Sequence, residues 1–134
     1  MSRPFARWLL PWLPSLAYMA LIWALSSQSR PMELPDVPMK DKVAHCLEYG
    51  VLAVLNLRAL RQTFVWPRLR SVAIAVLLTS AWGFFDELHQ AFVPGRFSDV
   101  YDWIADTVGA ITFASVAAIA LRARIAARGE PTQS

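Results

Sequence analysis

The chain has 134 residues, of which 56% are hydrophobic, and it carries a net charge of +3 at pH 7. The hydrophobic fraction exceeds the roughly 45–50% of soluble domains, so the composition predicts a single-domain membrane protein. The basic residues are scattered between apolar stretches, which argues against a nucleic-acid-binding face. The single cysteine, Cys46, excludes an intramolecular disulfide and argues against a cysteine-based zinc site.

A helix needs about 20 apolar residues to cross the bilayer core. The first candidate covers residues 8–25, with two prolines near its start, where a helix tolerates them best. A cleaved signal peptide is the alternative, but the apolar run is long and aromatic for that role. Residues 26–40 hold three prolines within eight positions, which predicts an extended loop. A second, less apolar helix is expected at residues 41–58.

A basic linker is expected to follow up to residue 70, before a third helix at residues 71–91 and a fourth at residues 99–121. Pro94 and Gly95 suit the centre of a type II turn between these two helices. The sequence therefore predicts an all-α, polytopic membrane protein with four transmembrane helices. We expect one domain over residues 1–128 and a frayed polar tail at residues 129–134.

The basic residues also predict an orientation. Four alternating spans place both termini and the linker between the second and third helices on one side, together with nine of the thirteen Lys and Arg residues. The positive-inside rule then puts both termini in the cytoplasm. Nine of the ten acidic residues fall toward the opposite, outer side, which is more than topology requires.

Helical periodicity gathers many of these polar residues into stripes on the second, third and fourth helices. Because charge facing lipid is costly, the stripes are expected to face one another around a polar site at the outer end. Gly83 and Gly109 would let the helices approach closely. Including Arg96 from the turn, the candidate site residues are Asp41, Lys42, His45, Glu48, Tyr49, Asp86, Glu87, Gln90, Arg96, Asp102 and Asp106.

Simpler structural roles stay open for several polar residues. Asp99 is suited to capping the fourth helix, with or without a role in the site. Asp41 and Lys42 also fit a solvated helix start. His89 lies off the stripe and is expected to pack at the interface, and Asn56 is expected to form an interhelical hydrogen bond.

Three motifs in order resemble the VanZ-like family of membrane proteins: DKVAHCLEY from Asp41, ELHQAFVPGR from Glu87, and the stretch from Ser98 through Gly109. The family pattern is roughly DKxxHFxxY, ExxQxFxPGR and DxxxNxxG. The resemblance covers residues 20–115. Two positions depart from the pattern, since Cys46 replaces a usual Phe and Asp106 stands where Asn is common, which adds a possible negative charge.

The resemblance implies a multi-pass protein of the bacterial inner membrane, whose family is named after a member linked to teicoplanin resistance. It assigns the motif roles to the matching positions in this chain. These are Asp41, Lys42, His45, Tyr49, Glu87, Gln90, Arg96, Asp102, Asp106 and Gly109. It implies no settled activity, and neither a cofactor nor an oligomeric state follows from it.

Three functions remain open at this point. The first is binding of a polar or lipid-linked envelope ligand, or of a lipoglycopeptide, with a contribution to glycopeptide-type antibiotic tolerance. The second is an intramembrane enzyme that uses His45 and nearby acids, with or without a divalent metal. The third is a small transporter or proton relay. All three place His45, Glu87, Arg96 and Asp102 close together at the outer end.

Overall fold

The computed structural model describes residues 7–29 and 39–128. Within these ranges the chain is helical and contains no strand. The elements are the 3-10 turn η1 (Leu10–Trp12) and the helices α2 (Leu13–Ser26), α3 (Lys40–Thr63), α4 (Arg68–Gln90) and α5 (Val100–Ala127). Counting the helical residues around η1, the first span is Arg7–Ser26, and all four spans are long and apolar enough to cross a membrane. The predicted all-α membrane fold is confirmed.

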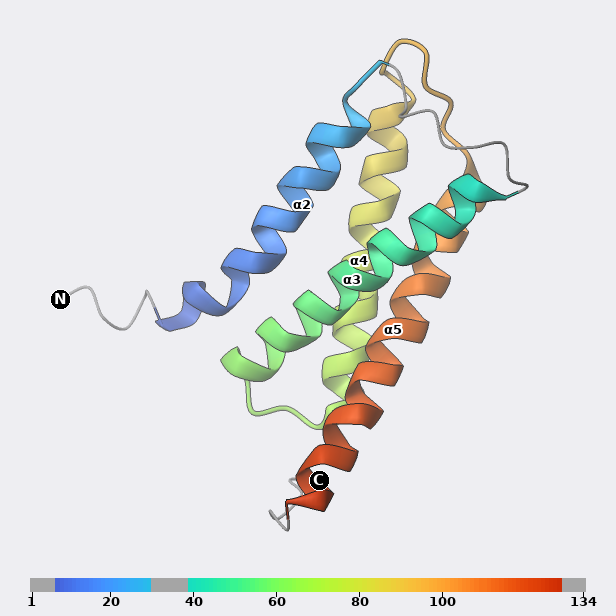
Figure 1. Cartoon of the computed structure of the whole chain (residues 1–134). Coiled ribbons are helices and arrows are strands. Elements are labelled where there is room, and N and C mark those ends of the chain that lie inside the picture. Colours follow the sequence, from blue (N-terminus) through green and yellow to red (C-terminus); the bar gives the residue numbers. More distant parts are fainter. Residues whose placement is uncertain (1–6, 30–38, 129–134) are drawn as a thin grey trace, which may run out of the picture.

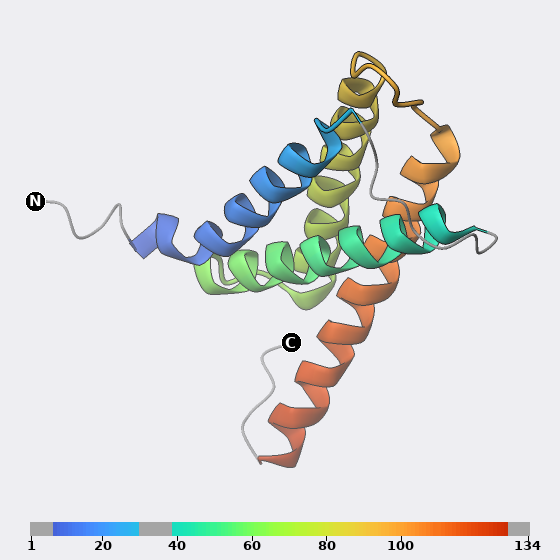
Figure 2. The same cartoon turned by 45° about the horizontal axis from the view of Figure 1, so that its top comes forward.

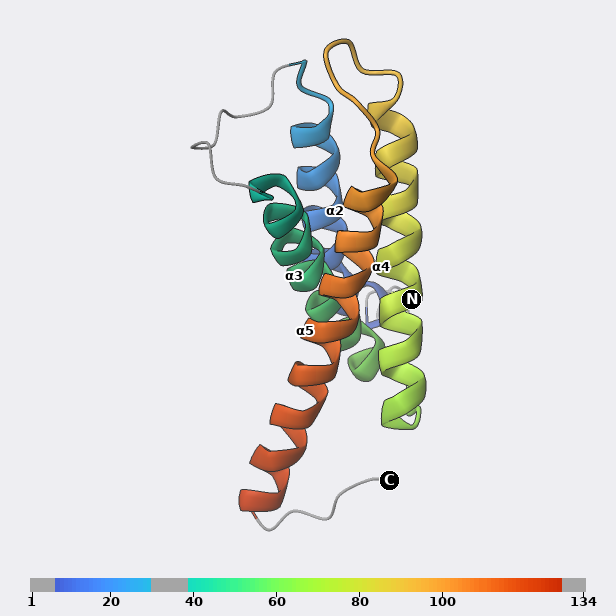
Figure 3. The same cartoon turned by 90° about the vertical axis from the view of Figure 1, so that its right-hand side faces the viewer.

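Neighbouring spans alternate in direction. α2 and α4 rise toward the top of Figure 1, whereas α3 and α5 descend from it. We call this top end, where Asp86, Glu87, Asp99, Asp102 and Asp106 lie, the acidic end. Figures 2 and 3 show α5 running on past the other helices at the opposite end. The end of α2, the start of α3, the end of α4 and the start of α5 lie toward the acidic end.

The helix α3 is central to the bundle and packs most extensively against α5. A Cβ atom added at Gly109 would collide with the backbone carbonyl of Cys46 on α3, so glycine is required where these two backbones meet. Small buried residues continue the contact away from the acidic end: Ala53 on α3, with Ala110 and Ala114 on α5. Small residues at helix contacts are typical of membrane bundles.

Neutral hydrogen bonds join the helices below the acidic end. Asn56 Nδ2 on α3 donates to Thr79 Oγ1 on α4 at 3.0 Å, which confirms the predicted interhelical role of Asn56. Trp12 Nε1 donates to Thr63 Oγ1 at 3.1 Å and thereby holds the start of α2 against the end of α3. Such bonds are stabilising in lipid because the alternative is an unsatisfied polar group in hydrocarbon.

Large apolar side chains cover the outside of the bundle. In a soluble protein so much exposed apolar surface would be unfavourable, whereas in a bilayer it faces lipid tails. The exposed residues include Leu13, Leu16 and Leu21 on α2, Leu77, Phe84 and Phe85 on α4, and Ile104, Ile111 and Ile119 on α5.

The helix ends differ from the predicted bounds by up to six residues. α3 continues to Thr63, through residues predicted as linker, because Ala59 and Leu60 are buried in the core. It ends before Trp66 and Pro67, since proline disfavours helical backbone at the preceding residue. α5 continues to Ala127 because its last turns are rich in Ala and Arg, which favour helix.

The turn between α4 and α5 has the predicted geometry. Gly95 has a positive φ of 81°, and Arg96 N donates to Val93 O at 3.1 Å, as in a type II turn with Pro94 and Gly95 at its centre. The loop expected at residues 26–40 is described only in part, because residues 30–38 lie outside the described ranges. The tail at residues 129–134 also lies outside them.

Candidate functional site

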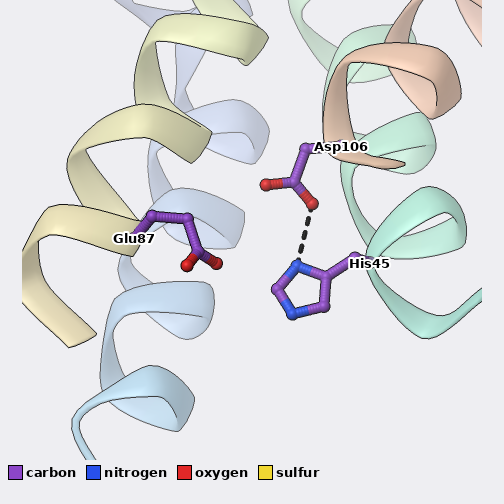
Figure 4. A group of neighbouring side chains, drawn as sticks. All are labelled: His45, Glu87 and Asp106. Carbon is purple, nitrogen blue, oxygen red and sulfur yellow. Dashed lines mark hydrogen bonds and ion pairs between the residues drawn. The ribbon is translucent and has the colours of Figure 1, made fainter. Parts of the chain in front are cut away.

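His45 and Asp106 form the centre of the polar cluster at the acidic end. His45 Nδ1 on α3 lies 2.9 Å from Asp106 Oδ1 on α5, and the Asp106 side chain is 1% exposed (Figure 4). Gly83 on α4 makes room for this aspartate, because a Cβ atom at Gly83 would lie 2.7 Å from Asp106 Oδ2. One residue from each of three helices is therefore needed to hold the pair in place.

Glu87 approaches the same pair from α4. It lies one turn beyond Gly83 on the same helix face, and its side chain extends toward the His45 ring in Figure 4. One carboxylate oxygen, Oε2, accepts a 2.9 Å hydrogen bond from the backbone N–H of Asp99. One ligand atom from each of His45, Glu87 and Asp106 can be chosen so that all three lie within 4.8 Å of one another.

Lys42 connects this cluster to the surface. Its Nζ donates to Asp102 Oδ1 at 2.7 Å and to Asp99 Oδ2 at 2.9 Å, which joins α3 to the start of α5. Asp102 Oδ2 in turn lies 3.9 Å from His45 Nε2. Exposure falls from 39% for the Asp99 side chain to 15% for Asp102 and 1% for Asp106. The cluster is therefore a graded polar path from the surface into the bundle.

Asp99 has the capping role that the sequence allowed, together with a place in the cluster. Its side chain accepts a hydrogen bond from Tyr101 N at 2.9 Å at the start of α5. The Lys42 ammonium, followed by this backbone bond, lowers the pKa of the Asp99 carboxyl below its ordinary value of 3.8. Asp99 is thus a cap, an ion-pair partner and, through its backbone, a donor to Glu87.

Asp86 and Gln90 form a separate contact beside the His45 cluster. Asp86 is buried and accepts from Ser26 Oγ at 2.5 Å and from Gln90 Nε2 at 3.0 Å. The bond from Ser26 fixes the last residue of α2 to α4, and the bond from Gln90 holds the Asp86 carboxylate within α4. His89, which the sequence placed off the polar stripe, stacks on Trp23 with ring centroids 3.9 Å apart and so packs α4 against α2.

Arg96 lies in the turn and points to α2 rather than to His45. Its Nη2 donates to the Leu25 carbonyl at 2.9 Å, and its Nε donates to the Gln28 carbonyl at 3.1 Å. Leu25 lies in the last turn of α2, and Gln28 lies two residues beyond the end of the helix. The guanidinium therefore stabilises the join between α2 and the α4–α5 turn.

The remaining candidates lie around the cluster on α3. Tyr49 is fully buried, and its ring is parallel to that of His45 with centroids 6.2 Å apart. Glu48 is partly buried one turn below His45, whereas Asp41 is exposed on the first turn. Lys42, His45, Glu87, Asp102 and Asp106 thus come together directly.

Two contributors were absent from the predicted site. Asp99 was expected as a cap with or without a role in the site, and the signal for a site role was its i, i+3 spacing to Asp102 on the polar stripe. Ser26 was not among the candidate site residues, because a serine at the end of an apolar span carries no sign of its partner. Contacts such as Ser26 to Asp86, 60 residues apart, arise from tertiary packing.

Comparison with known proteins extends the motif resemblance to nearly the whole chain. Residues 7–121, which contain the first three spans, most of α5 and every residue of the polar cluster, match the family described as VanZ/LLP1. No curated protein matches the chain. No solved structure matches it either. Because the family match covers far more than half of the sequence, the chain belongs to the VanZ-like family of membrane proteins.

Proposed function

We propose that the protein is a bacterial inner-membrane binding protein that holds the polar head group of a cell-envelope amphiphile at the acidic end. Binding there would contribute to tolerance of glycopeptide-type antibiotics. The observation that carries the proposal is the graded cluster of Asp99, Lys42, Asp102, His45 and Asp106, which leads from the surface into the bundle. A head group can enter such a path while its apolar tail stays in lipid.

Burial supports a local binding site over a path across the membrane. Among the described residues, the buried acidic side chains are Asp86, Glu87 and Asp106, and all lie at the acidic end. The buried polar residues farther down are neutral, such as Asn56 and Ser71. A transporter or proton relay needs polar groups that continue to the other side. Binding at one end is therefore the function that these residues favour.

The membrane orientation gives the proposal its direction. Arginines concentrate on the loops and helix ends opposite the acidic end, as in Arg58, Arg61 and Arg68. The positive-inside rule then places the acidic end outside the cytoplasmic membrane. Envelope precursors and glycopeptide antibiotics act on that side, so the proposed ligand and the site share a compartment.

The experiment compares a strain lacking the gene with strains complemented by wild-type protein or by variants. Loss of the gene is expected to lower the minimal inhibitory concentration of teicoplanin several-fold, and wild-type protein is expected to restore it. The double variant His45→Ala, Asp102→Asn should not restore it, because it removes the middle of the polar path. Asp41→Asn is the matched control, since Asp41 is exposed on the same helix end.

Membrane levels of each variant are measured by immunoblot, so that loss of protein is not mistaken for loss of binding. An antibiotic that acts on the ribosome serves as a second control and should be equally effective in all strains. If the deletion strain is as tolerant of teicoplanin and other envelope-active agents as its parent, the proposed contribution to tolerance is wrong.

A second function, intramembrane acid–base catalysis, is favoured by the His45–Asp106 contact. A carboxylate beside one imidazole nitrogen orients the ring and stabilises its charged form, which is how catalytic histidines are held. Among the described residues, no hydrogen bond joins a Ser, Thr or Cys to His45, so a hydroxyl or thiol nucleophile activated by this histidine is not part of the proposal. Turnover of a lipid-linked phosphate by purified protein, lost in Asp106→Asn, would favour catalysis over binding.

A further inference from the structure

We propose that His45, Glu87 and Asp106 form a binding site for a divalent transition-metal ion such as Zn²⁺ or Mn²⁺. The three side chains come from α3, α4 and α5 and converge between them (Figure 4). One imidazole nitrogen with two carboxylates is a mixed ligand set that suits first-row divalent ions. The metal site goes beyond head-group binding and is testable without any amphiphile.

Two buried carboxylate oxygens indicate that the cluster accommodates a further cation. Glu87 is 5% exposed, and its Oε1 has no hydrogen-bond partner among the described residues. Asp106 is fully buried, and its Oδ2 likewise has no partner among them. Buried polar atoms are rarely left unsatisfied, since burial without a partner is costly. A metal ion would satisfy both oxygens at once.

The positive side chains nearby are already engaged elsewhere. Lys42 Nζ bonds to Asp99 and Asp102, and Arg96 donates to carbonyls at the end of α2. Neither side chain is in hydrogen-bond contact with Glu87 or Asp106. Apart from the Asp99 backbone N–H that bonds to Glu87, the His45 imidazole is the remaining polar group beside these two buried carboxylates among the described residues, and a divalent cation would balance their charge.

The distances suit one ion after a small side-chain movement. Two ligands bound at about 2.1 Å from one ion lie about 3.0 Å apart at right angles and about 4.2 Å apart when opposite. His45 Nδ1 and Asp106 Oδ1 lie 2.9 Å apart, and one ligand atom can be chosen from each of the three residues so that all lie within 4.8 Å of one another. The proposal therefore requires a change in side-chain torsions that moves the ligand atoms by less than about 1 Å.

A carboxylate also lies beside the other ring nitrogen of His45, at a distance longer than a hydrogen bond. A ligating histidine usually donates its other ring N–H to a carboxylate, which fixes the ring and its tautomer. Asp102 Oδ2 lies 3.9 Å from His45 Nε2, and Lys42 holds Asp102 in position. Binding through Nδ1 would displace the proton between Nδ1 and Asp106 and leave the Nε2 proton facing Asp102.

The test measures metal content directly. Protein purified without a histidine tag is treated with a chelator, reloaded with Zn²⁺ or Mn²⁺, and analysed by inductively coupled plasma mass spectrometry. We expect about one ion per wild-type chain and at least roughly tenfold weaker binding in His45→Ala, Glu87→Gln and Asp106→Asn. The ion should also raise the unfolding temperature of wild-type protein and leave that of His45→Ala unchanged.

A matched control comes from the same chain. His89→Ala removes the other histidine, which stacks on Trp23. This variant should bind the ion as the wild type does. Equal loss of metal in His45→Ala and His89→Ala, or a reloaded wild type with far less than one ion per chain, would overturn the proposal.

X-ray absorption spectroscopy of the zinc-loaded wild type gives an answer that does not depend on variant folding. The spectrum should contain one imidazole with oxygen ligands and no sulfur. A spectrum without imidazole would overturn the proposed site even if His45→Ala failed to fold. A variant that loses metal binding but keeps antibiotic tolerance would show that the proposed function does not depend on the metal site. A variant that loses tolerance but keeps metal binding would show that the metal site is present without the proposed function.

Discussion

Ser26 Oγ at the end of α2 lies 2.5 Å from Asp86 Oδ1 on α4 and donates a buried hydrogen bond to it. The pair fixes the first span to the rest of the bundle at the acidic end. Ser26→Ala would leave this carboxylate oxygen without that donor. We expect a loss of about 1–2 kcal/mol in the free energy of unfolding, measured by denaturation in detergent micelles.

Ser27→Ala is the matched control for this bond. The Ser27 hydroxyl is exposed and contacts Trp23 O and His89 Nε2 at the surface. Its loss should change stability by less than about 0.5 kcal/mol. Equal destabilisation by the two alanine variants would mean that the Ser26–Asp86 bond does not hold α2 in place.

Gly109→Ala should weaken the contact between α3 and α5. On helix propensity alone the change would be favourable, because alanine is the best helix former. Here the added methyl group would collide with the Cys46 carbonyl, so we expect destabilisation of about 1–3 kcal/mol. Val108→Ala, at a half-exposed neighbouring position, is the control and should have a smaller effect. Thermal unfolding that is unchanged in Gly109→Ala would contradict the close approach.

The Lys42–Asp99 contact predicts a dependence of stability on pH. The pKa of Asp99 is lower in the folded state than its ordinary value, chiefly because Lys42 bonds to the carboxylate. Its contribution is therefore present above the unfolded pKa and is lost as the pH falls through the folded pKa. Lys42→Met should lose less unfolding free energy than wild type when the pH is lowered from about 6 to about 3.

Asp99→Asn tests the same acid dependence by changing the other residue of the contact. Asparagine still caps α5 but does not titrate, so this variant should also lose less stability on acidification. The measurement is the unfolding temperature as a function of pH. If both variants follow the wild-type curve, other carboxylates determine the acid response.

The arginine distribution predicts that the C-terminus is cytoplasmic. With four alternating spans, the sequence predicts nine of the thirteen basic residues on the side of the two termini, which the positive-inside rule assigns to the cytoplasm. A C-terminal green fluorescent protein fusion should be fluorescent, and an alkaline phosphatase fusion at the same point should be inactive. The reverse pattern would place the acidic end inside the cell and would remove the basis for an envelope ligand.

The sequence predicted the four spans because length and hydropathy determine which segments can cross a bilayer. It also predicted that Lys42, His45, Glu87, Asp102 and Asp106 meet, since charged stripes on antiparallel helices avoid lipid by facing one another. The role of Gly109 followed from its position on the stripe. Each of these predictions rests on the residue pattern within single helices.

The hydrogen-bond partners of the residues at the acidic end could not be predicted in the same way. Arg96 was expected near His45, yet it bonds to carbonyls of α2, because those acceptors depend on where α2 ends in space. Asp86 and Glu87 are adjacent in sequence, but the first contacts Ser26 and the second contacts the backbone of Asp99. Helical periodicity gives the face of a residue and not the neighbour that tertiary packing brings to it.

The order of the helices along the chain has a consequence for biosynthesis. His45 and Glu87 are translated and inserted before α5, which supplies Asp106, Asp102 and the glycine contact at Gly109. A nascent chain of three spans therefore holds a histidine and a glutamate in the membrane without their partners. The last span, α5, completes the acidic end. A protein truncated before α5 would therefore expose the His45 and Glu87 side chains to lipid or to quality-control proteases.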